Sequence, residues 1–190
     1  MNYKTLILEK KEGMAKIILN RPEALNALNK QMREEILAAC NEIETDDSIK
    51  ALIFSGSGRA FCAGDDLKEL KVSDEPFTAR ASRSSNKMQQ AIERLSKPVI
   101  AAVHGYCYTG AFDIVLNCDI VIASDDAVFA DTHARWGIFP GTGAAQYVTR
   151  LVGKMKAMEL FLTCEPITAA EAERIGLINR VVPVDKLGQT

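Results

Sequence analysis

Two glycine-rich turns in the sequence have residue types that suit the binding of an anion by main-chain atoms. The first is Ala63-Gly64-Asp65-Asp66, and the second runs from Gly105 to Ala111. Each follows an apolar run and leads into a predicted helix, whose first turn offers unpaired N–H groups and a positive dipole end. If the turns face each other, they can direct N–H donors at one developing oxyanion, at roughly 3–4 kcal/mol per donor. The alternative is that both turns are only tight connections.

Competing chemistries find little support around these turns. Neither turn matches the nucleotide-binding patterns G-x-x-x-x-G-K-[ST] or G-x-G-x-x-G. The sequence has no G-x-S-x-G nucleophile elbow. Cys62 and Cys107 lie within the turns, but an apolar packing role is expected for both.

Two ionisable side chains are candidates for proton transfer. Asp113 lies three residues after Gly110 on a predicted helix, so both lie on one face and the carboxylate is within reach of whatever the Gly110 N–H binds. The alternative is an acidic residue that favours the first turn through the helix dipole. His133 lies in a predicted loop and titrates near neutrality, although a single loop histidine is often only a surface group. Asp131 and Arg135 flank His133 and can pair with it or with each other, and neither is assigned a catalytic role.

The elements that position these residues alternate between strands and helices. The apolar runs at 3–9, 14–19, 50–56, 98–103, 119–124 and 177–184 predict strands. Helices are predicted from the Asn29 cap onward and at 66–70, 80–95, 109–118, 143–152, 154–163 and 168–175. Residues 55–66 are predicted to be too glycine-rich for a regular element, and 71–80 to form a mobile loop. The order indicates an α/β fold with a mostly parallel sheet that is covered on both faces.

Composition narrows the class of protein. The 190 residues include 23 Lys+Arg and 25 Asp+Glu, so the net charge is 23 − 25 = −2. The absence of a basic block argues against a nucleic-acid or membrane partner. The five cysteines form no metal-binding or disulfide pattern, so we expect reduced thiols and no metal. No signal peptide or membrane-spanning run is apparent, and we expect a soluble, cytoplasmic protein.

Several motifs, in order, resemble the enoyl-CoA hydratase/isomerase (crotonase) superfamily along nearly the whole chain. They are Leu19-Asn20-Arg21-Pro22 with Asn26-Ala27, the run from Gly58 to Leu67, the run from Lys97 to Gly105, Cys118-Asp119, Gly137-Ile138-Phe139-Pro140-Gly141, Glu171-Ala172 and Gly176-Leu177. The resemblance implies a spiral of strand–strand–helix (ββα) units, usually assembled as trimers or pairs of trimers. It also implies that the protein binds acyl-CoA thioesters.

The resemblance assigns roles to particular positions. By motif position, the Asp65 and Gly110 N–H groups are the two donors that stabilise an enolate-like intermediate. Arg59 and Lys68 occupy positions where basic residues commonly face CoA phosphates. The remaining positions expected to contact the substrate or its CoA moiety are Ala24, Ala63, Asp66, Leu67 and Gly141.

The sequence departs from the family pattern at two places. Typical hydratases have glutamates where this chain has Asp113 and His133. Asp is one methylene shorter than Glu, and the ordinary pKa of His is near 6.5, about two units above that of Glu. The chain also ends soon after a predicted strand. We therefore expect one crotonase-like core domain over 1–190 without the helices that cover the acyl-CoA site and build the trimer. A homotrimer or hexamer is expected where the full C-terminus is present.

These features lead to one principal hypothesis and several alternatives. The principal one is an acyl-CoA-processing enzyme, a lyase or isomerase of fatty acid metabolism that acts as enoyl-CoA hydratase or double-bond isomerase. Asp113 and His133 would transfer protons, and coenzyme A would be needed only as part of the substrate. A thioester hydrolase or decarboxylase is the nearest alternative. A crotonase-fold protein that binds acyl-CoA without efficient catalysis is the other.

Overall fold

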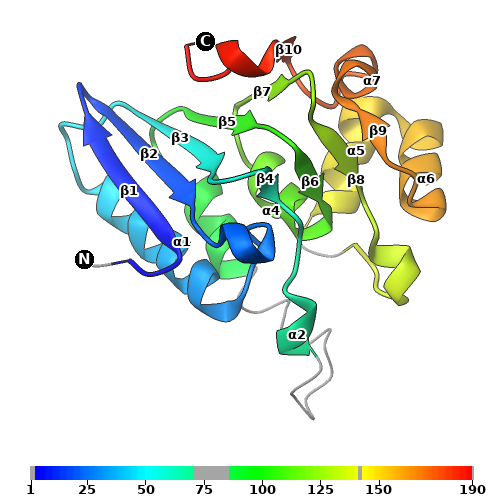
Figure 1. Ribbon diagram of the computed structural model, residues 1–190, viewed down its shortest axis with the longest axis horizontal. Coiled ribbons are helices and arrows are strands. Elements are labelled where there is room, and N and C mark those ends of the chain that lie inside the picture. The colour runs from blue at the N-terminus through cyan, green and yellow to red at the C-terminus, as the bar shows by residue number, and fades with distance from the viewer. Residues whose placement is uncertain (1–2, 71–85, 141–142, 190) are drawn as a thin grey trace.

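A six-stranded sheet forms the larger layer of the protein (Figure 1). The computed structural model describes residues 3–70, 86–140 and 143–189. The sheet order is β1-β2-β3-β5-β7-β10. An antiparallel hairpin of β1 and β2 begins it, and the other pairs are parallel. The bounds are Leu6–Lys11, Met14–Leu19, Ala51–Gly56, Val99–Val103, Ile120–Ser124 and Arg180–Val182.

A second, four-stranded sheet has the order β4-β6-β8-β9. Its strands are Ala60–Cys62, Tyr106–Tyr108, Val128–Ala130 and Ile167–Thr168. The prediction that 55–66 contains no regular element was therefore wrong, and the turn predicted from Gly105 also contains a strand. Strands of three residues have little local signal of their own. They form here because each is hydrogen-bonded to a neighbouring strand that is distant in the sequence.

The chain passes from one sheet to the other in successive turns. The strand pairs β3–β4, β5–β6 and β7–β8 each place their first strand in the large sheet and their second in the small one. Helical segments follow β4, β6 and β8. The predicted α/β class and the spiral of ββα units are thereby confirmed. The consequence for function is that the carboxyl ends of β4, β6 and β8 lie side by side, since β4–β6 and β6–β8 are parallel pairs.

Helices surround the sheets, and most lie where the sequence predicts them. Helix α1 (Lys30–Glu44) begins at the predicted cap, because the Asn29 Oδ1 accepts the Met32 N–H at 2.8 Å. The predicted helix at 80–95 is described over 86–93, and the loop predicted at 71–80 lies outside the described residues. The segment predicted as one helix at 109–118 is a 3-10 turn, η2 (Thr109–Ala111), followed by α4 (Phe112–Val115). The other helices are η1 (Pro22–Ala24), α2 (Leu67–Leu70), η3 (His133–Trp136), α5 (Ala144–Val152), α6 (Lys154–Thr163), α7 (Ala169–Arg174) and η4 (Val184–Lys186).

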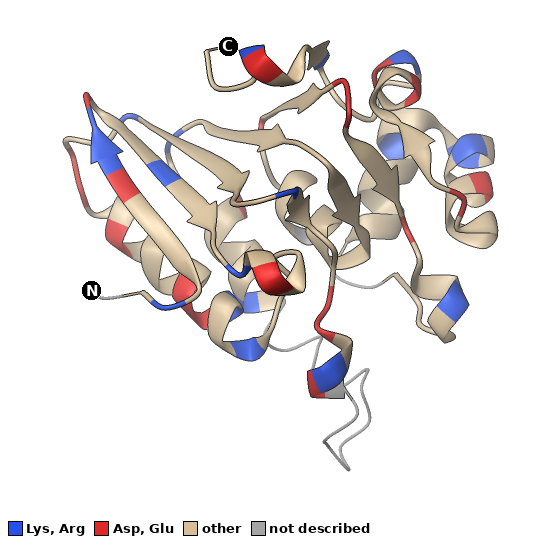
Figure 2. Cartoon of the chain, in the orientation of Figure 1, with Lys and Arg blue, Asp and Glu red and all other residues tan. Residues whose placement is uncertain are grey.

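The core lies between the sheets and their covering helices. Ile17, Leu52 and Phe54 of the large sheet and Met32 and Ile36 of α1 are fully buried in one continuous cluster. Strands β5, β6, β7 and β8 contain no charged residue, and the charges lie on the surrounding elements (Figure 2). Most residues of β5 and β7 are buried or half-buried, which is consistent with their largely apolar sequences. No helix in the described part of the chain is long and apolar enough to cross a bilayer.

Candidate active site

A buried asparagine holds the loop between β2 and α1 against the start of the small sheet. The Asn26 side chain is fully buried, and its amide donates to the Ser57 and Ala60 carbonyls at 2.9 and 2.7 Å. Its Oδ1 accepts the Arg21 N–H at 2.8 Å. The backbone here is unusual, since Leu25 and Asn26 both have positive φ, at 51° and 57°. The three hydrogen bonds of Asn26 stabilise this conformation. The loop is thereby placed beside Ala63, whose N–H donates to the Leu25 carbonyl at 3.0 Å.

The segment after β4 pairs with the same loop through a single parallel bridge between Leu28 and Asp65. The bridge uses the Gly64 carbonyl, which accepts the Leu28 N–H at 2.7 Å, and the Asp66 N–H, which donates to the Leu28 carbonyl at 3.1 Å. Because flanking residues make both bonds, the N–H of Asp65 itself points away from Leu28. It donates no hydrogen bond within the described residues.

The Gly110 turn lies directly against Asp65. A Cβ built on Gly110 would be 3.2 Å from the Asp65 nitrogen, and one built on Gly64 would be 3.4 Å from the Gly110 nitrogen. A Cβ is about 2.5 Å from the nitrogen of its own residue, so the two main-chain nitrogens are at most about 5.7 Å apart. One oxygen that accepts both N–H groups at about 2.9 Å can bridge that separation. The Gly110 N–H also has no acceptor in the part of the chain that the structure describes.

A strained threonine links the Gly110 turn to the segment that contains His133, which was predicted to be a loop but begins the 3-10 helix η3. Thr109 has φ 48°, which is rare for a β-branched residue. Its Oγ1 lies 2.6 Å from the Thr132 Oγ1 and accepts the Thr132 N–H at 3.1 Å. The strain is retained because these bonds join the ends of the paired strands β6 and β8. The two predicted functional segments, around Gly110 and His133, are therefore neighbours in space.

His133 forms a buried pair with Asp131. The His133 Nδ1 lies 2.8 and 3.0 Å from the two carboxylate oxygens of Asp131, and the His133 N–H donates to the Asp131 Oδ1 at 3.0 Å. The exposed fractions of the two residues are only 8% and 3%. A buried carboxylate accepts a hydrogen bond from Nδ1, so in the neutral imidazole the proton is on Nδ1 and Nε2 is the basic nitrogen.

The pairing of His133 settles an alternative that the sequence leaves open. Asp131 is the partner of His133, whereas the Arg135 Nη2 donates to the Cys164 carbonyl at 3.1 Å. The spacing Asp-x-His was the available signal, but spacing alone does not distinguish an Asp–His pair from an Asp–Arg pair.

Of the other predicted positions, Asp113 lies on α4 one turn after Gly110, and its side chain is not described. Gly141 lies outside the described residues.

Two of the predicted CoA-contacting residues, Ala63 and Asp66, are hydrogen-bonded to the loop before α1. The Asp66 carboxylate accepts from the Arg21 Nη2 at 2.9 Å, which ties the start of α2 to the loop that contains Ala24. Burial raises the pKa of the Asp66 carboxyl, but hydrogen bonds from Arg21 and the Lys68 N–H outweigh it, so the net shift is downward. Leu67 at the start of α2 is partly exposed, at 38%, and Arg59 and Lys68 have exposed side chains. Exposed cations beside an apolar surface suit a phosphorylated ligand.

Two arginine–aspartate pairs beside the Leu28–Asp65 bridge could not be predicted from the sequence. Arg21 and Arg33 each donate one N–H group to a backbone carbonyl, of Ala27 and Leu28 respectively, and another to a carboxylate, of Asp66 and Asp65. The partners are 45 and 32 residues apart in the sequence. No local pattern joins residues at such separations, so only the fold reveals these pairs.

A cysteine nucleophile and a metal site find no support at this location. Cys62 and Cys107 are fully buried, and burial raises the pKa of the Cys107 thiol well above its ordinary value, which disfavours the nucleophilic thiolate. No group of three or more His, Cys, Asp or Glu among the described residues could hold a metal ion.

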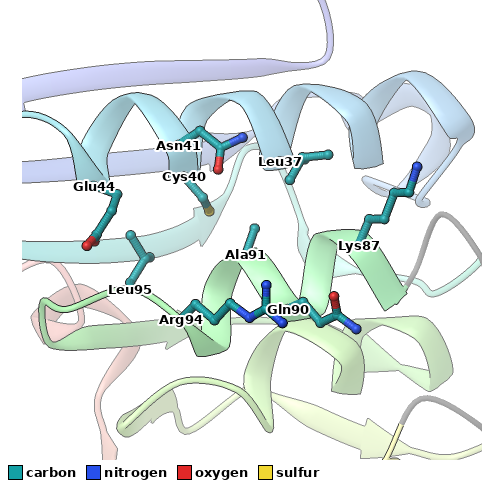
Figure 3. Close-up of a pocket in the computed structure, with 9 residues that line it drawn as sticks. All are labelled: Leu37, Cys40, Asn41, Glu44, Lys87, Gln90, Ala91, Arg94 and Leu95. Carbon is teal, nitrogen blue, oxygen red and sulfur yellow. The ribbon is translucent and has the colours of Figure 1, made fainter.

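A separate hollow of about 280 Å³ lies between α1 and the helix at 86–93 (Figure 3). Its described lining residues are Leu37, Cys40, Asn41, Glu44, Lys87, Gln90, Ala91, Arg94 and Leu95. They include none of the residues around Asp65, Gly110 and His133. Its lining is of mixed charge and polarity.

Comparison with known proteins identifies the family. A family model described as enoyl-CoA hydratase/isomerase matches residues 9–190. The chain belongs to the enoyl-CoA hydratase/isomerase family. A protein named as a probable enoyl-CoA hydratase from Mycobacterium tuberculosis is 42% identical over 189 residues, which are 98% of this chain and 72% of that protein. A short-chain-enoyl-CoA hydratase from Clostridium acetobutylicum is 41% identical over 191 residues, or 100% of this chain and 73% of the relative.

Solved structures of the enoyl-CoA hydratase/isomerase family have the same fold. The crystal structure of an enoyl-CoA hydratase from Bacillus anthracis matches with a TM-score of 0.93 and 33% identity, over 98% of this chain and 73% of that one. An enoyl-CoA hydratase from Mycobacterium smegmatis matches with a TM-score of 0.92 and 34% identity, over 98% and 73%. The resemblance stated from the sequence motifs is confirmed.

The Asp131–His133 pair leads to a prediction about the histidine tautomer. Replacement of Asp131 by Asn offers Nδ1 an amide N–H donor in place of a carboxylate, so the proportion of the Nε2–H tautomer should rise. The two histidines of the chain give a simple ¹⁵N NMR spectrum. The His133 signals should report an Nδ1–H ring in the wild type and a changed tautomer ratio in Asp131→Asn. His104, whose Nε2 lies 2.9 Å from the Gly58 carbonyl, is the internal control. Unchanged His133 signals would contradict the assignment.

Proposed function

We propose that this member of the enoyl-CoA hydratase/isomerase family is an enoyl-CoA hydratase or double-bond isomerase. The observation that carries the proposal is the convergence of the Asp65 and Gly110 N–H groups from two separate bends. Hydration and isomerisation of an enoyl thioester both pass through an enolate-like species with negative charge on the thioester oxygen. Two preformed N–H donors stabilise that charge more than the neutral carbonyl, and this difference accelerates the reaction.

His133 is the proposed general base and acid. Its Nε2 accepts a proton from water in hydration, or from the substrate α- or γ-carbon in isomerisation, and returns a proton at the alternate carbon. The buried Asp131 orients the ring and stabilises the imidazolium that forms. Asp113, which follows Gly110 by one turn, is the proposed second proton-transfer group. Both positions contain glutamate in typical hydratases, and both substitutes here are ionisable.

Coenzyme A is proposed to lie along the loop before α1 and the start of α2. Ala24, Ala63 and Leu67 offer small or apolar contacts there, and the Arg21–Asp66 pair fixes the two segments relative to each other. Arg59 and Lys68 are proposed to pair with its phosphates. Gly141 completes the set of proposed substrate contacts. No metal or redox cofactor takes part in this mechanism.

One observation favours thioester hydrolysis as a second candidate. A buried Asp–His pair beside two oxyanion donors is also suited to activate water for attack on the carbonyl carbon itself. The products separate the two functions. Hydration adds one water to the intact thioester, isomerisation leaves the mass unchanged, and hydrolysis releases free CoA thiol.

Substitution of Gly110 tests the proposed oxyanion site. The added methyl group of Gly110→Ala would lie 2.5 Å from the Asp65 Oδ1 and 3.2 Å from its nitrogen, so it would intrude between the two donors. With crotonyl-CoA as substrate, kcat should fall by roughly 10²–10³-fold. Gly188→Ala is the control, because a Cβ there meets nothing within 4 Å and its φ is not positive. Unchanged kcat in a folded Gly110→Ala protein would exclude the oxyanion assignment.

Substitution of the proton-transfer groups tests their roles. His133→Ala and Asp113→Asn should each lower kcat for crotonyl-CoA by roughly 10²–10⁴-fold, with products followed by mass spectrometry. His104→Ala is the control histidine variant and should retain the wild-type rate. If wild type binds the substrate but turns over none in a broad panel of enoyl-CoAs, the protein is instead an acyl-CoA-binding member of the family.

A homotrimer or a hexamer is the proposed assembly where the full C-terminus is present. One face of α6 supports it, because Met155, Met158 and Leu162 lie at helical spacing and are 82%, 46% and 67% exposed. Contiguous exposed apolar side chains of this kind mark interaction surfaces.

Charge placed on this face should weaken the assembly. The double variant Met155→Glu/Leu162→Glu should shift the sedimentation coefficient from that of a trimer or hexamer toward that of a monomer at micromolar concentration. The control is Lys154→Glu, which changes charge at the start of the same helix. A monomeric wild-type protein would contradict the role of this face.

A further inference from the structure

The carboxylate of Asp65 lies beside the site at which negative charge develops in the proposed reaction. Its Oδ1 is 2.5 Å from the position that a Gly110 Cβ would occupy, so it packs against the Cα of Gly110. Asp65 therefore contributes both an N–H donor and a negative side chain next to the same point. An unpaired carboxylate there would oppose the enolate by like-charge repulsion in a partly desolvated environment.

Arg33 neutralises this carboxylate from α1. Its side chain is 6% exposed, and its Nη2 donates to the Asp65 Oδ1. Its Nη1 donates to the Leu28 carbonyl at 2.7 Å, and Leu28 is the bridge partner of Asp65. One guanidinium thus contacts both sides of the bridge that orients the Asp65 N–H. Its planar fork allows this double contact, which a lysine ammonium cannot reproduce with the same geometry.

We propose that Arg33 is a positioning residue for catalysis, which holds and neutralises the Asp65 carboxylate so that the adjacent N–H serves the oxyanion. The inference rests on the proposed function. Helix α1 contributes no proposed substrate contact, but through Arg33 it would have a direct electrostatic influence on the transition state.

Arg21 provides a natural comparison within the same loop. The Arg21 guanidinium makes the same two kinds of contact as that of Arg33. Its Nη1 donates to the Ala27 carbonyl at 2.6 Å and its Nη2 donates to the Asp66 Oδ2 at 2.9 Å. Asp66 is not among the atoms that a Cβ on Gly110 would meet most closely, whereas Asp65 accounts for all three. Loss of either arginine removes an equivalent backbone contact, but only loss of Arg33 leaves a negative charge against Gly110.

Single and double variants measure the charge effect with crotonyl-CoA. Arg33→Met should lower kcat by about 10²-fold, the effect of a like charge at roughly 6 Å with an effective dielectric constant near 20. Its effect on KM should be smaller. Arg33→Lys retains the charge and should retain at least tenfold more of kcat than Arg33→Met. The double variant Arg33→Met/Asp65→Ala has no unpaired charge and should recover at least tenfold in kcat over Arg33→Met. Arg21→Met should lower kcat at least tenfold less than Arg33→Met does.

Thermal unfolding of every variant distinguishes a loss of kcat that is caused by charge from one that is caused by misfolding. If Arg33→Met does not fold, Arg33→Lys and the double variant decide: each should keep kcat within tenfold of the wild type, and a loss of about 10²-fold in both would overturn the proposal. Equal losses of kcat in Arg33→Met, Arg33→Lys and the double variant would overturn the proposal, because packing alone would then explain them. A wild-type protein without any turnover would instead contradict the proposed function, whereas an active wild type with a fully active Arg33→Met would contradict only this inference.

Discussion

Two glycine-bearing bends, at Gly64 and Gly110, approach each other so closely that neither tolerates a side chain. Gly64 has φ 97°, and a side chain on it would meet the Tyr108 carbonyl at 2.9 Å. Gly110 lies so near Asp65 that a methyl group there would enter the same space. Only hydrogen atoms fit between the bends, so two main-chain amides from different turns of the spiral can approach one point. The buried Asn26 and the Leu28–Asp65 bridge maintain this approach from the N-terminal side.

The spiral fold supplies the second requirement, which is that the reactive groups meet at one edge. Parallel pairing of β4, β6 and β8 places the ends of three distant segments side by side. The Asp65 segment, the Gly110 turn and the start of η3 at His133 follow these three strands in order. The contact between Thr109 and Thr132 then couples the last two directly. A strained backbone at Thr109 is retained there because the neighbouring hydrogen bonds compensate for its conformational cost.

Charge is distributed at this edge with partners for each buried group. Asp131 pairs with His133, Asp65 with Arg33 and Asp66 with Arg21. Buried carboxylates without such partners would be costly, and those near a developing enolate would also slow the reaction. The same arrangement stabilises the fold and, in the proposed reaction, leaves no unpaired negative charge at 65, 66 or 131 beside the developing enolate.

The family, the α/β class, the longer strands and helices, and the cap of α1 are predictable from the sequence. These features have local causes: apolar periodicity, a capping side chain at Asn29, and motifs whose residues are contiguous. Tertiary structure alone decided the short strands of the second sheet, since three-residue segments such as 60–62 form only when distant neighbours pair with them. It also decided that Asp131 rather than Arg135 pairs with His133, and that Arg33 reaches Asp65. The first contact depends on the direction of the side chains, and the second joins residues that are 32 positions apart in the chain. Local spacing in the sequence predicts neither of them.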